Sequence, residues 1–206
     1  PFQMDIMMFW VNQELLKQAG LDEIKNTGDF DILQKSLKNP DQYAYGDAWE
    51  NTHVYNSLSQ FVNFWGGDYF DWTDPKTKDA ARYMKSMLDE KNTSPAQFVD
   101  QYEQMEEKFI RGKYGCVLCI RVLWVHFLML MYMGKIKYIW HRFPCFIRKK
   151  ATNIATWQYV LNNASENKDA AVRFLQYAAG YEGSTEYAKI MKSYPARVDV
   201  IENEGY

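Results

Sequence analysis

The chain has 206 residues, of which 47% are hydrophobic and 17% aromatic, and its formal net charge is −2. This composition excludes an intrinsically disordered chain and is sufficient for a large core. The near-neutral charge gives no sign of a nucleic-acid partner. Seven Trp and fifteen Tyr are many for this length, an excess that fits either a bulky core or contact with carbohydrate.

The first third of the chain predicts alternating strands and helices. Residues 5–11 are a short apolar run typical of a buried strand, and Asn12 is placed to cap a helix that ends at Gly20. A second helix begins at Thr27 or Asp29 and ends before Pro40. Residues 43–49 are turn-rich, whereas residues 51–65 repeat apolar side chains at helical spacing.

The remaining elements follow the same alternation. The pairs Asp74-Pro75 and Ser94-Pro95 are each an N-cap followed by a first-turn proline, so each predicts the start of a helix. Further strands are predicted at residues 116–118, 135–140 and 152–161, and further helices at residues 122–133, 170–179 and 184–191. Helices predominate, which indicates an α/β or α+β lobe.

Residues 64–71, FWGGDYFD, form the most informative segment. Two glycines allow the backbone to turn, and four aromatic residues and two carboxylates surround them. Flat apolar rings beside hydrogen-bonding acids suit a sugar, which has an apolar face and a rim of hydroxyls. The same pattern also fits a helix end whose rings pack into the core.

The three cysteines are best interpreted as buried thiols. Cys116 and Cys119 form a C-x-x-C pair, but a zinc site normally needs a second pair of ligands, and an odd total argues against a disulfide framework. Residues 116–133 come nearest to a membrane span and are interrupted by Arg121 and His126. The first residues carry no signal-peptide pattern, which predicts a chain that begins partway through a protein.

Several segments resemble motifs of the extracellular solute-binding proteins of ABC sugar importers. Residues 9–22, FWVNQELLKQAGLD, are similar to a strand-to-helix motif of that family, and residues 65–70, WGGDYF, to its double-glycine turn. Residues 105–115, 156–175 and 182–187 resemble its later motifs in the same order. The similarity weakens at residues 119–124, where a glycine of the family is absent and Trp124 comes about two residues late.

This resemblance implies a fold of the α/β class: a helix-rich, periplasmic-binding-protein-like type II architecture, mainly its C-terminal lobe. Residues 1–150 would form most of that lobe. Residues 151–206 would return to an N-terminal lobe that is largely missing from this sequence. The resemblance therefore implies a fragment of a two-lobed protein of about twice this length.

The function implied by the resemblance is capture of a sugar or oligosaccharide in a cleft between the lobes and delivery to an ABC permease in the membrane. Such a protein is not an enzyme, needs no cofactor or metal and binds no nucleic acid. It works outside the cell or in the periplasm, in some cases through a lipid anchor at an N-terminus missing here. The candidate ligand-binding residues are Asp47, Trp49, Glu50, Trp65, Asp68, Trp124 and Trp157.

Two other classes of function remain open from the residues. A carbohydrate-active enzyme would use paired carboxylates, either Asp68 with Asp71 or Glu106 with Glu107, although the second pair is adjacent on a helix and points apart. A polymer-binding or membrane-binding module would use the segment 108–150, which holds Lys and Arg but no Asp or Glu. No Ser-His-Asp, phosphate-loop or dinucleotide motif is present.

Overall fold

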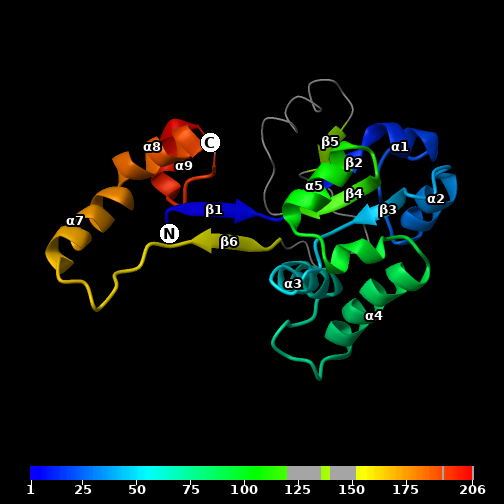
Figure 1. Cartoon of the computed structure of the whole chain (residues 1–206), viewed down its shortest axis with the longest axis horizontal. Helices are drawn as coiled ribbons and strands as arrows, with labels where there is room; N and C mark the ends of the chain where they lie inside the picture. Colours follow the sequence, from blue (N-terminus) through cyan, green and yellow to red (C-terminus); the bar gives the residue numbers. More distant parts are fainter. Residues whose placement is uncertain (120–135, 140–151, 192, 206) are drawn as a thin grey trace. The chain divides into compact units, whose positions relative to one another are not determined.

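The computed structural model describes residues 1–119, 136–139, 152–191 and 193–205 (Figure 1). The chain divides into two compact units. The larger unit is Met7–Asn153, and the smaller unit combines Pro1–Ile6 with Ile154–Tyr206. The backbone therefore passes between the units at two places, after Ile6 and after Asn153.

A mixed sheet forms the centre of the larger unit (Figure 1). Its strand order is β3 (Tyr43–Gly46), β4 (Tyr114–Cys119), β2 (Met8–Asn12) and β5 (Ile136–Ile139). β2 pairs antiparallel with β4 and β5, and β3 pairs parallel with β4. The predicted central strand at residues 116–118 and the strand at 135–140 are thus confirmed, and the α/β class with them.

Strand β3 was not predicted, because residues 43–49 have the composition of a turn. Its last residue, Gly46, lies against the ring of Tyr114: a Cβ at Gly46 would come within 2.2 Å of that ring. Gly46 suggests a turn in the sequence, but in the structure it allows close packing between the neighbouring strands β3 and β4.

Strands β2 and β4 are buried on both faces of the sheet. Alternate residues of β2 and β4, such as Phe9, Val11 and Leu118, enter one core with four helices. These helices are α1 (Gln13–Gln18), α2 (Gly28–Ser36), α3 (Val54–Trp65) and α4 (Pro75–Asp89). On the other face, Cys119 Sγ lies 3.1 Å from Glu106 of α5 (Tyr102–Ile110). β2 and β4 are rich in apolar residues because both of their faces are buried.

Two of the predicted helix starts are confirmed. Asn12 Oδ1 accepts hydrogen bonds from the backbone N–H groups of Glu14 and Leu15, and Asp74 caps α4 with Pro75 in its first turn. Ser94-Pro95 instead begins only a short 3₁₀ helix, η1 (Pro95–Phe98). The helix predicted to start at Ser94-Pro95 is therefore only one short turn, and a new N-cap at Gln101 starts α5 separately.

In its described residues, the smaller unit has a strand pair and three helices. β1 (Gln3–Ile6) pairs antiparallel with β6 (Ile154–Trp157), beside α7 (Lys168–Ala178), α8 (Tyr181–Met191) and α9 (Val198–Glu204). The run at residues 5–11 is therefore not one strand. It divides at Met7 between β1 and β2, which lie in different sheets.

The last helices also differ from the sequence-based expectation. The helix predicted at residues 184–191 begins earlier, at Tyr181, so Gly183 lies inside α8, where a Cβ would come within 2.3 Å of the Tyr177 carbonyl oxygen at the end of α7. Glycine is needed for this close approach. Helix α9 was not predicted, and the helix expected at residues 122–133 lies outside the described residues.

The interpretation of the cysteines as buried thiols is confirmed for two of them. Cys116 and Cys119 are free, and both are fully buried on β4. Three positions apart on a strand, they point to opposite faces: the Cys116 thiol donates to the Ala44 carbonyl, and that of Cys119 to Glu106. Cys145 lies outside the described residues. Among the helices that the structure describes, none has the length and apolarity needed to cross a membrane.

Candidate functional site

Helix α3 provides one wall of an open cavity in the larger unit. Tyr55, Ser59 and Asn63 are spaced four residues apart, so their side chains share one face of the helix. The helix ends at Gly66, whose φ of 73° is the left-handed conformation that glycine adopts without strain. This ending directs the chain back along the same face.

The turn after α3 is held against helix α4. A Cβ at Gly67 would lie 2.6 Å from Thr77 Oγ1 and 2.9 Å from the Thr77 backbone nitrogen, so only glycine fits between them. The Thr77 hydroxyl donates to the carbonyl oxygen of Asp68 at 2.8 Å. The double glycine thus places Asp68 and the following aromatic residues next to α3.

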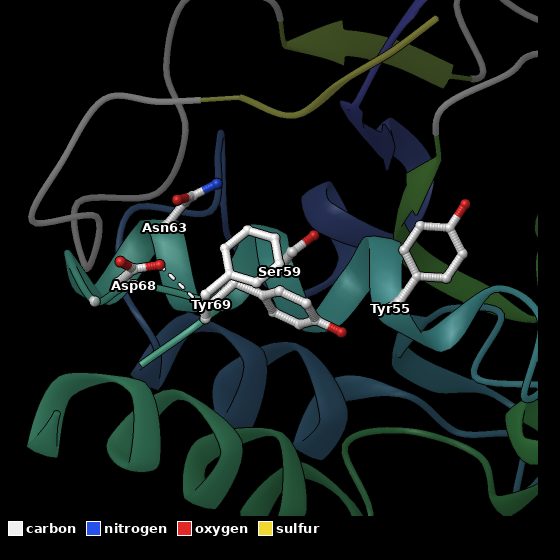
Figure 2. A pocket seen from close by; sticks show the side chains of 7 residues that line it. Tyr55, Ser59, Asn63, Asp68 and Tyr69 are labelled. Atoms are coloured by element: carbon white, nitrogen blue, oxygen red, sulfur yellow. Dashed lines mark hydrogen bonds between the residues drawn. The ribbon is translucent and has the colours of Figure 1, made fainter. Parts of the chain in front are cut away.

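The cavity has a volume of about 530 Å³, which is within the range of roughly 300–1,000 Å³ typical of small-molecule sites. Its lining combines aromatic, hydroxyl, amide and carboxylate groups from α3 and the turn: Tyr55, Ser59, Asn63, Gly67, Asp68, Tyr69 and Phe70. Figure 2 shows Asn63 and Asp68 towards one end and Tyr55 at the other, with Ser59 and Tyr69 between them.

Two acceptor oxygens in this cavity have no protein partner among the described residues. Asp68 Oδ1 accepts the Phe70 N–H at 2.9 Å, which leaves Oδ2 available. Asn63 Nδ2 donates to Asn153 Oδ1 at 2.7 Å, which leaves the Asn63 carbonyl oxygen available. Phe70 is 89% exposed beside them. Apolar ring faces next to free acceptors suit a ligand that has hydroxyl donors on an apolar frame.

Of the predicted ligand residues that the structure describes, Asp68 is the one that lines the cavity. Trp65 lies in the same turn, but its ring packs against the rings of Tyr83, at 4.9 Å between centroids, and Phe61, at 6.2 Å. The structure therefore places Trp65 at the edge of the core and Asp68 at the surface.

Asp47 and Trp49 are brought together, but inside the larger unit. Their exposed fractions are 0% and 5%, and Trp49 Nε1 donates to Asp47 Oδ2 at 2.9 Å. The hydroxyls of Tyr45 and Ser57 and the Ala48 N–H also donate to this carboxylate. Both carboxylate oxygens are thus used within the fold, and neither side chain presents a surface to a ligand in this structure.

Burial raises the pKa of the Asp47 carboxyl, while the hydrogen bonds that it accepts act in the opposite direction. The same burial raises the pKa of Tyr45 well above its usual value, followed by the charge and the hydrogen bond of Asp47. This cluster is a satisfied polar network in the core.

The other three predicted residues lie apart from the cavity or outside the described residues. Glu50 is partly exposed and is held by Thr52 and His53, with the hydrogen bond from the Thr52 hydroxyl lowering its pKa. Trp157 belongs to the smaller unit, where it is 52% exposed and its Nε1 donates to Asp5 Oδ2 at 2.7 Å. Trp124 is outside the described residues.

Each carboxylate of the pairs considered for an enzyme has a hydrogen-bond or ion-pair partner within the fold. Asp71 accepts hydrogen bonds from the Thr73 N–H and hydroxyl, the latter lowering the pKa of Asp71, whereas a general acid needs a raised one. Glu106 is buried against Cys119, and Glu107 is exposed and paired with Arg111, so these two carboxylates point apart. The basic segment is largely outside the described residues, and Lys108, Arg111 and Lys113, whose side chains are described, each pair with a carboxylate.

The polar face of α3 was missed by the sequence analysis. The apolar positions of residues 51–65 predict the helix, but they give no information on what its polar side chains face. The spacing of Tyr55, Ser59 and Asn63 is the signal that could have identified the wall of the cavity.

Comparison with known proteins agrees with this fold. The profile of the family described as bacterial extracellular solute-binding protein matches residues 1–185. The chain belongs to this family. A search of curated proteins gives no match for the chain.

Similar solved structures come from the same kind of protein. The chain resembles the maltose-bound MalE3 of T. maritima with a TM-score of 0.77 and 16% identity, covering all of the present chain and 56% of MalE3. For an ABC transporter solute-binding protein from Thermotoga lettingae, bound with α-D-tagatose, the TM-score is 0.78 and the identity 16%, with 98% of the present chain and 55% of that protein covered. For the GacH receptor of Streptomyces glaucescens, solved with and without acarbose, the TM-score is 0.73 and the identity 18%, with 98% of the present chain and 53% of the receptor covered. The chain thus spans about half the length of these relatives, and at these identities the likeness shows the fold.

Proposed function

We propose that this chain is part of a sugar-binding receptor of an ABC importer and that the α3 cavity contacts the sugar. The observation that supports this most directly is the cavity itself, where exposed aromatic rings lie beside two free acceptor oxygens. A pyranose presents an apolar face for the rings and hydroxyl donors for Asn63 and Asp68. Family membership and the sugars named for the similar structures support the same ligand class.

The charge of the lining residues favours an uncharged saccharide. Apart from the tyrosines, Asp68 is the only ionisable acid or base among the described residues that line the cavity. A carboxylate next to a sugar phosphate or uronic acid raises the free energy of binding through repulsion, which is about 1 kcal/mol at 4 Å even in bulk water. Neutral sugars are therefore the proposed ligands.

We also propose an assignment of the two units. The larger unit would be most of the C-terminal lobe, and residues 151–206 would belong with the lobe that is largely missing from this sequence. The division of the chain after Asn153 and the coverage of about half of each relative support this assignment. In the complete receptor, the sugar would be held between the lobes and passed to a permease, outside the cell or in the periplasm and without turnover; a lipid anchor there is part of the same proposal.

Titration calorimetry of the 206-residue chain with maltose, α-D-tagatose and acarbose tests the proposal, with glucose 6-phosphate as an anionic control. We expect saturable binding of at least one neutral sugar with a Kd on the order of 1 mM, since one unit covers only part of the ligand. Asn63→Ala should weaken this binding, and glucose 6-phosphate should bind more weakly than the neutral sugars. Absence of saturable binding to the whole panel would overturn the proposal.

The same samples separate a receptor from an enzyme. After incubation with maltose and with acarbose, the reducing ends in solution should remain constant. A steady release of reducing ends that Asp68→Asn abolishes would favour the carbohydrate-active enzyme instead.

A further inference from the structure

Asn153 uses its whole side chain in hydrogen bonds to helix α3. Its Nδ2 donates to the carbonyl oxygen of Asn56 at 3.0 Å and to Ser59 Oγ at 2.6 Å. Its Oδ1 accepts from Asn63 Nδ2 at 2.7 Å. One amide thus contacts three successive positions along one side of the helix.

The backbone groups of Asn153 are hydrogen-bonded as well. Its N–H donates to Gln60 Oε1 at 2.7 Å, and its carbonyl accepts the Met7 N–H at 3.0 Å. The neighbouring Thr152 hydroxyl donates to the Met7 carbonyl at 2.8 Å. Asn153 and Met7 are the residues of the larger unit at which the chain enters and leaves the smaller unit. The position of Asn153 is therefore determined from several sides.

These contacts determine which way the Asn63 amide faces. A backbone carbonyl such as that of Asn56 only accepts, so Asn153 must present its NH₂ group there and its oxygen to Asn63. Asn63 in turn must give its NH₂ group to Asn153. Its own carbonyl oxygen is left for the cavity, where no described residue donates to it.

We propose that Asn153 is the positioning residue of the α3 cavity: it orients the Asn63 amide so that the carbonyl oxygen receives a hydroxyl of the bound saccharide. This inference rests on the proposed function for its ligand. It also predicts selectivity, because a sugar hydroxyl replaced by an ether or hydrogen at that point cannot donate to Asn63. Without Asn153, the Asn63 amide rotates freely and presents its acceptor only part of the time.

A double-mutant cycle on the whole chain tests the proposal by calorimetry with the neutral sugar that binds the wild type. We expect Asn63→Ala and Asn153→Ala each to weaken binding about 3- to 10-fold, as for the loss of one hydrogen bond. The double variant should be no weaker than Asn63→Ala, because Asn153 acts through Asn63. Additive losses, or an Asn153→Ala variant with wild-type affinity, would overturn the proposal.

A conservative variant separates positioning from stability. Asn153→Asp keeps an oxygen for Asn63 Nδ2 but cannot donate to Asn56 or Ser59. It should therefore unfold at lower urea concentration than the wild type while its sugar affinity stays within about twofold. As a remote control, Asn12→Ala removes the cap of α1 and should lower stability without changing affinity. If affinity simply follows stability across these variants, Asn153 has only a structural role.

An NMR measurement without ligand keeps this test independent of the proposed function. The side-chain NH₂ protons of Asn63 should exchange slowly with solvent in the wild type and in Asn153→Asp, and faster in Asn153→Ala, because the acceptor of their hydrogen bond is then absent. An unchanged exchange rate in Asn153→Ala would contradict the positioning role directly. If no neutral sugar binds the wild type, the proposed function fails, while this measurement still decides whether Asn153 orients Asn63.

Discussion

Two clusters of acids and aromatic rings in the larger unit look alike in the sequence and differ in the structure. Asp47 with Trp49 is sealed, and its carboxylate accepts hydrogen bonds from four groups of the protein. Asp68 with Phe70 is open, and one carboxylate oxygen has no partner among the described residues. The difference shows that an acid beside a ring indicates ligand binding only when its hydrogen-bonding capacity is not already used by the fold.

The comparison predicts its largest effect for Asp47→Ala. This change leaves the buried hydroxyls of Tyr45 and Ser57 without their acceptor, so we expect the free energy of unfolding to fall by about 2–4 kcal/mol. Asp68→Ala is the matched control and should cost less than about 1 kcal/mol, because water replaces its single hydrogen bond. Urea unfolding followed by Trp fluorescence measures both. Equal losses would mean that the two clusters do not differ as described.

A smaller effect is expected for Gly67→Ala. The new Cβ meets Thr77 in the first turn of α4, including its backbone nitrogen, so the turn must move at a cost of about 1–3 kcal/mol. Because the same turn carries Asp68, sugar affinity should also fall. Gly20→Ala, where a Cβ has open space but φ is +73°, should reduce stability through its backbone alone and leave affinity unchanged. Loss of affinity in both variants would contradict this account.

The buried carboxyl of Asp47 should also affect how the stability of the protein depends on pH. Burial raises the pKa of Asp47, so the folded state holds this proton more tightly than the unfolded chain, whose Asp pKa is about 3.9. The stability that protonation contributes is present below that value and is lost as pH rises through the higher folded pKa. Relative to Asp47→Asn, the wild type should therefore lose stability between about pH 4 and the folded pKa. Urea titrations of both proteins across this range measure the difference, and a relative gain of stability with rising pH would refute the assignment.

The smallest effect on stability is expected for Phe70→Ala at the open cluster. Its ring is 89% exposed, so the free energy of unfolding should change by less than about 0.5 kcal/mol. Sugar affinity should nevertheless fall about 2- to 10-fold through the loss of the ring face. Phe64→Ala provides the contrast, since this ring is 2% exposed and its removal should cost about 3–5 kcal/mol. Unchanged sugar affinity in Phe70→Ala would remove this ring from the binding surface.

Much of the fold could be predicted because local signals determine it. The caps at Asn12 and Asp74 and the apolar run of β4 act over a few residues, and each was recognised. The division of residues 5–11 at Met7 could not be predicted in this way. It depends on Asn153, which is far along the chain and whose carbonyl takes the Met7 N–H.

The candidate site was predicted only in part, for a related reason. Asp68 was found because the double glycine marks its turn. Asn63 was missed, since its importance depends on which of its atoms Asn153 leaves free. Asp47 and Trp49 are residue types that often bind sugars, but their burial depends on long-range packing that the composition does not reveal.

The arrangement of the two thiols on β4 has a consequence for their chemistry in an oxidising environment, such as the one outside the cell that we propose for the complete receptor. An oxidising environment joins cysteines that can reach each other and attacks those that oxidants can reach. Cys116 and Cys119 cannot form a disulfide with each other, because the strand directs them to opposite sides of the sheet. Oxidants do not reach them, because both are fully buried. The folded larger unit therefore needs no reductant to keep this pair as thiols, and an alkylating reagent should label them only after unfolding.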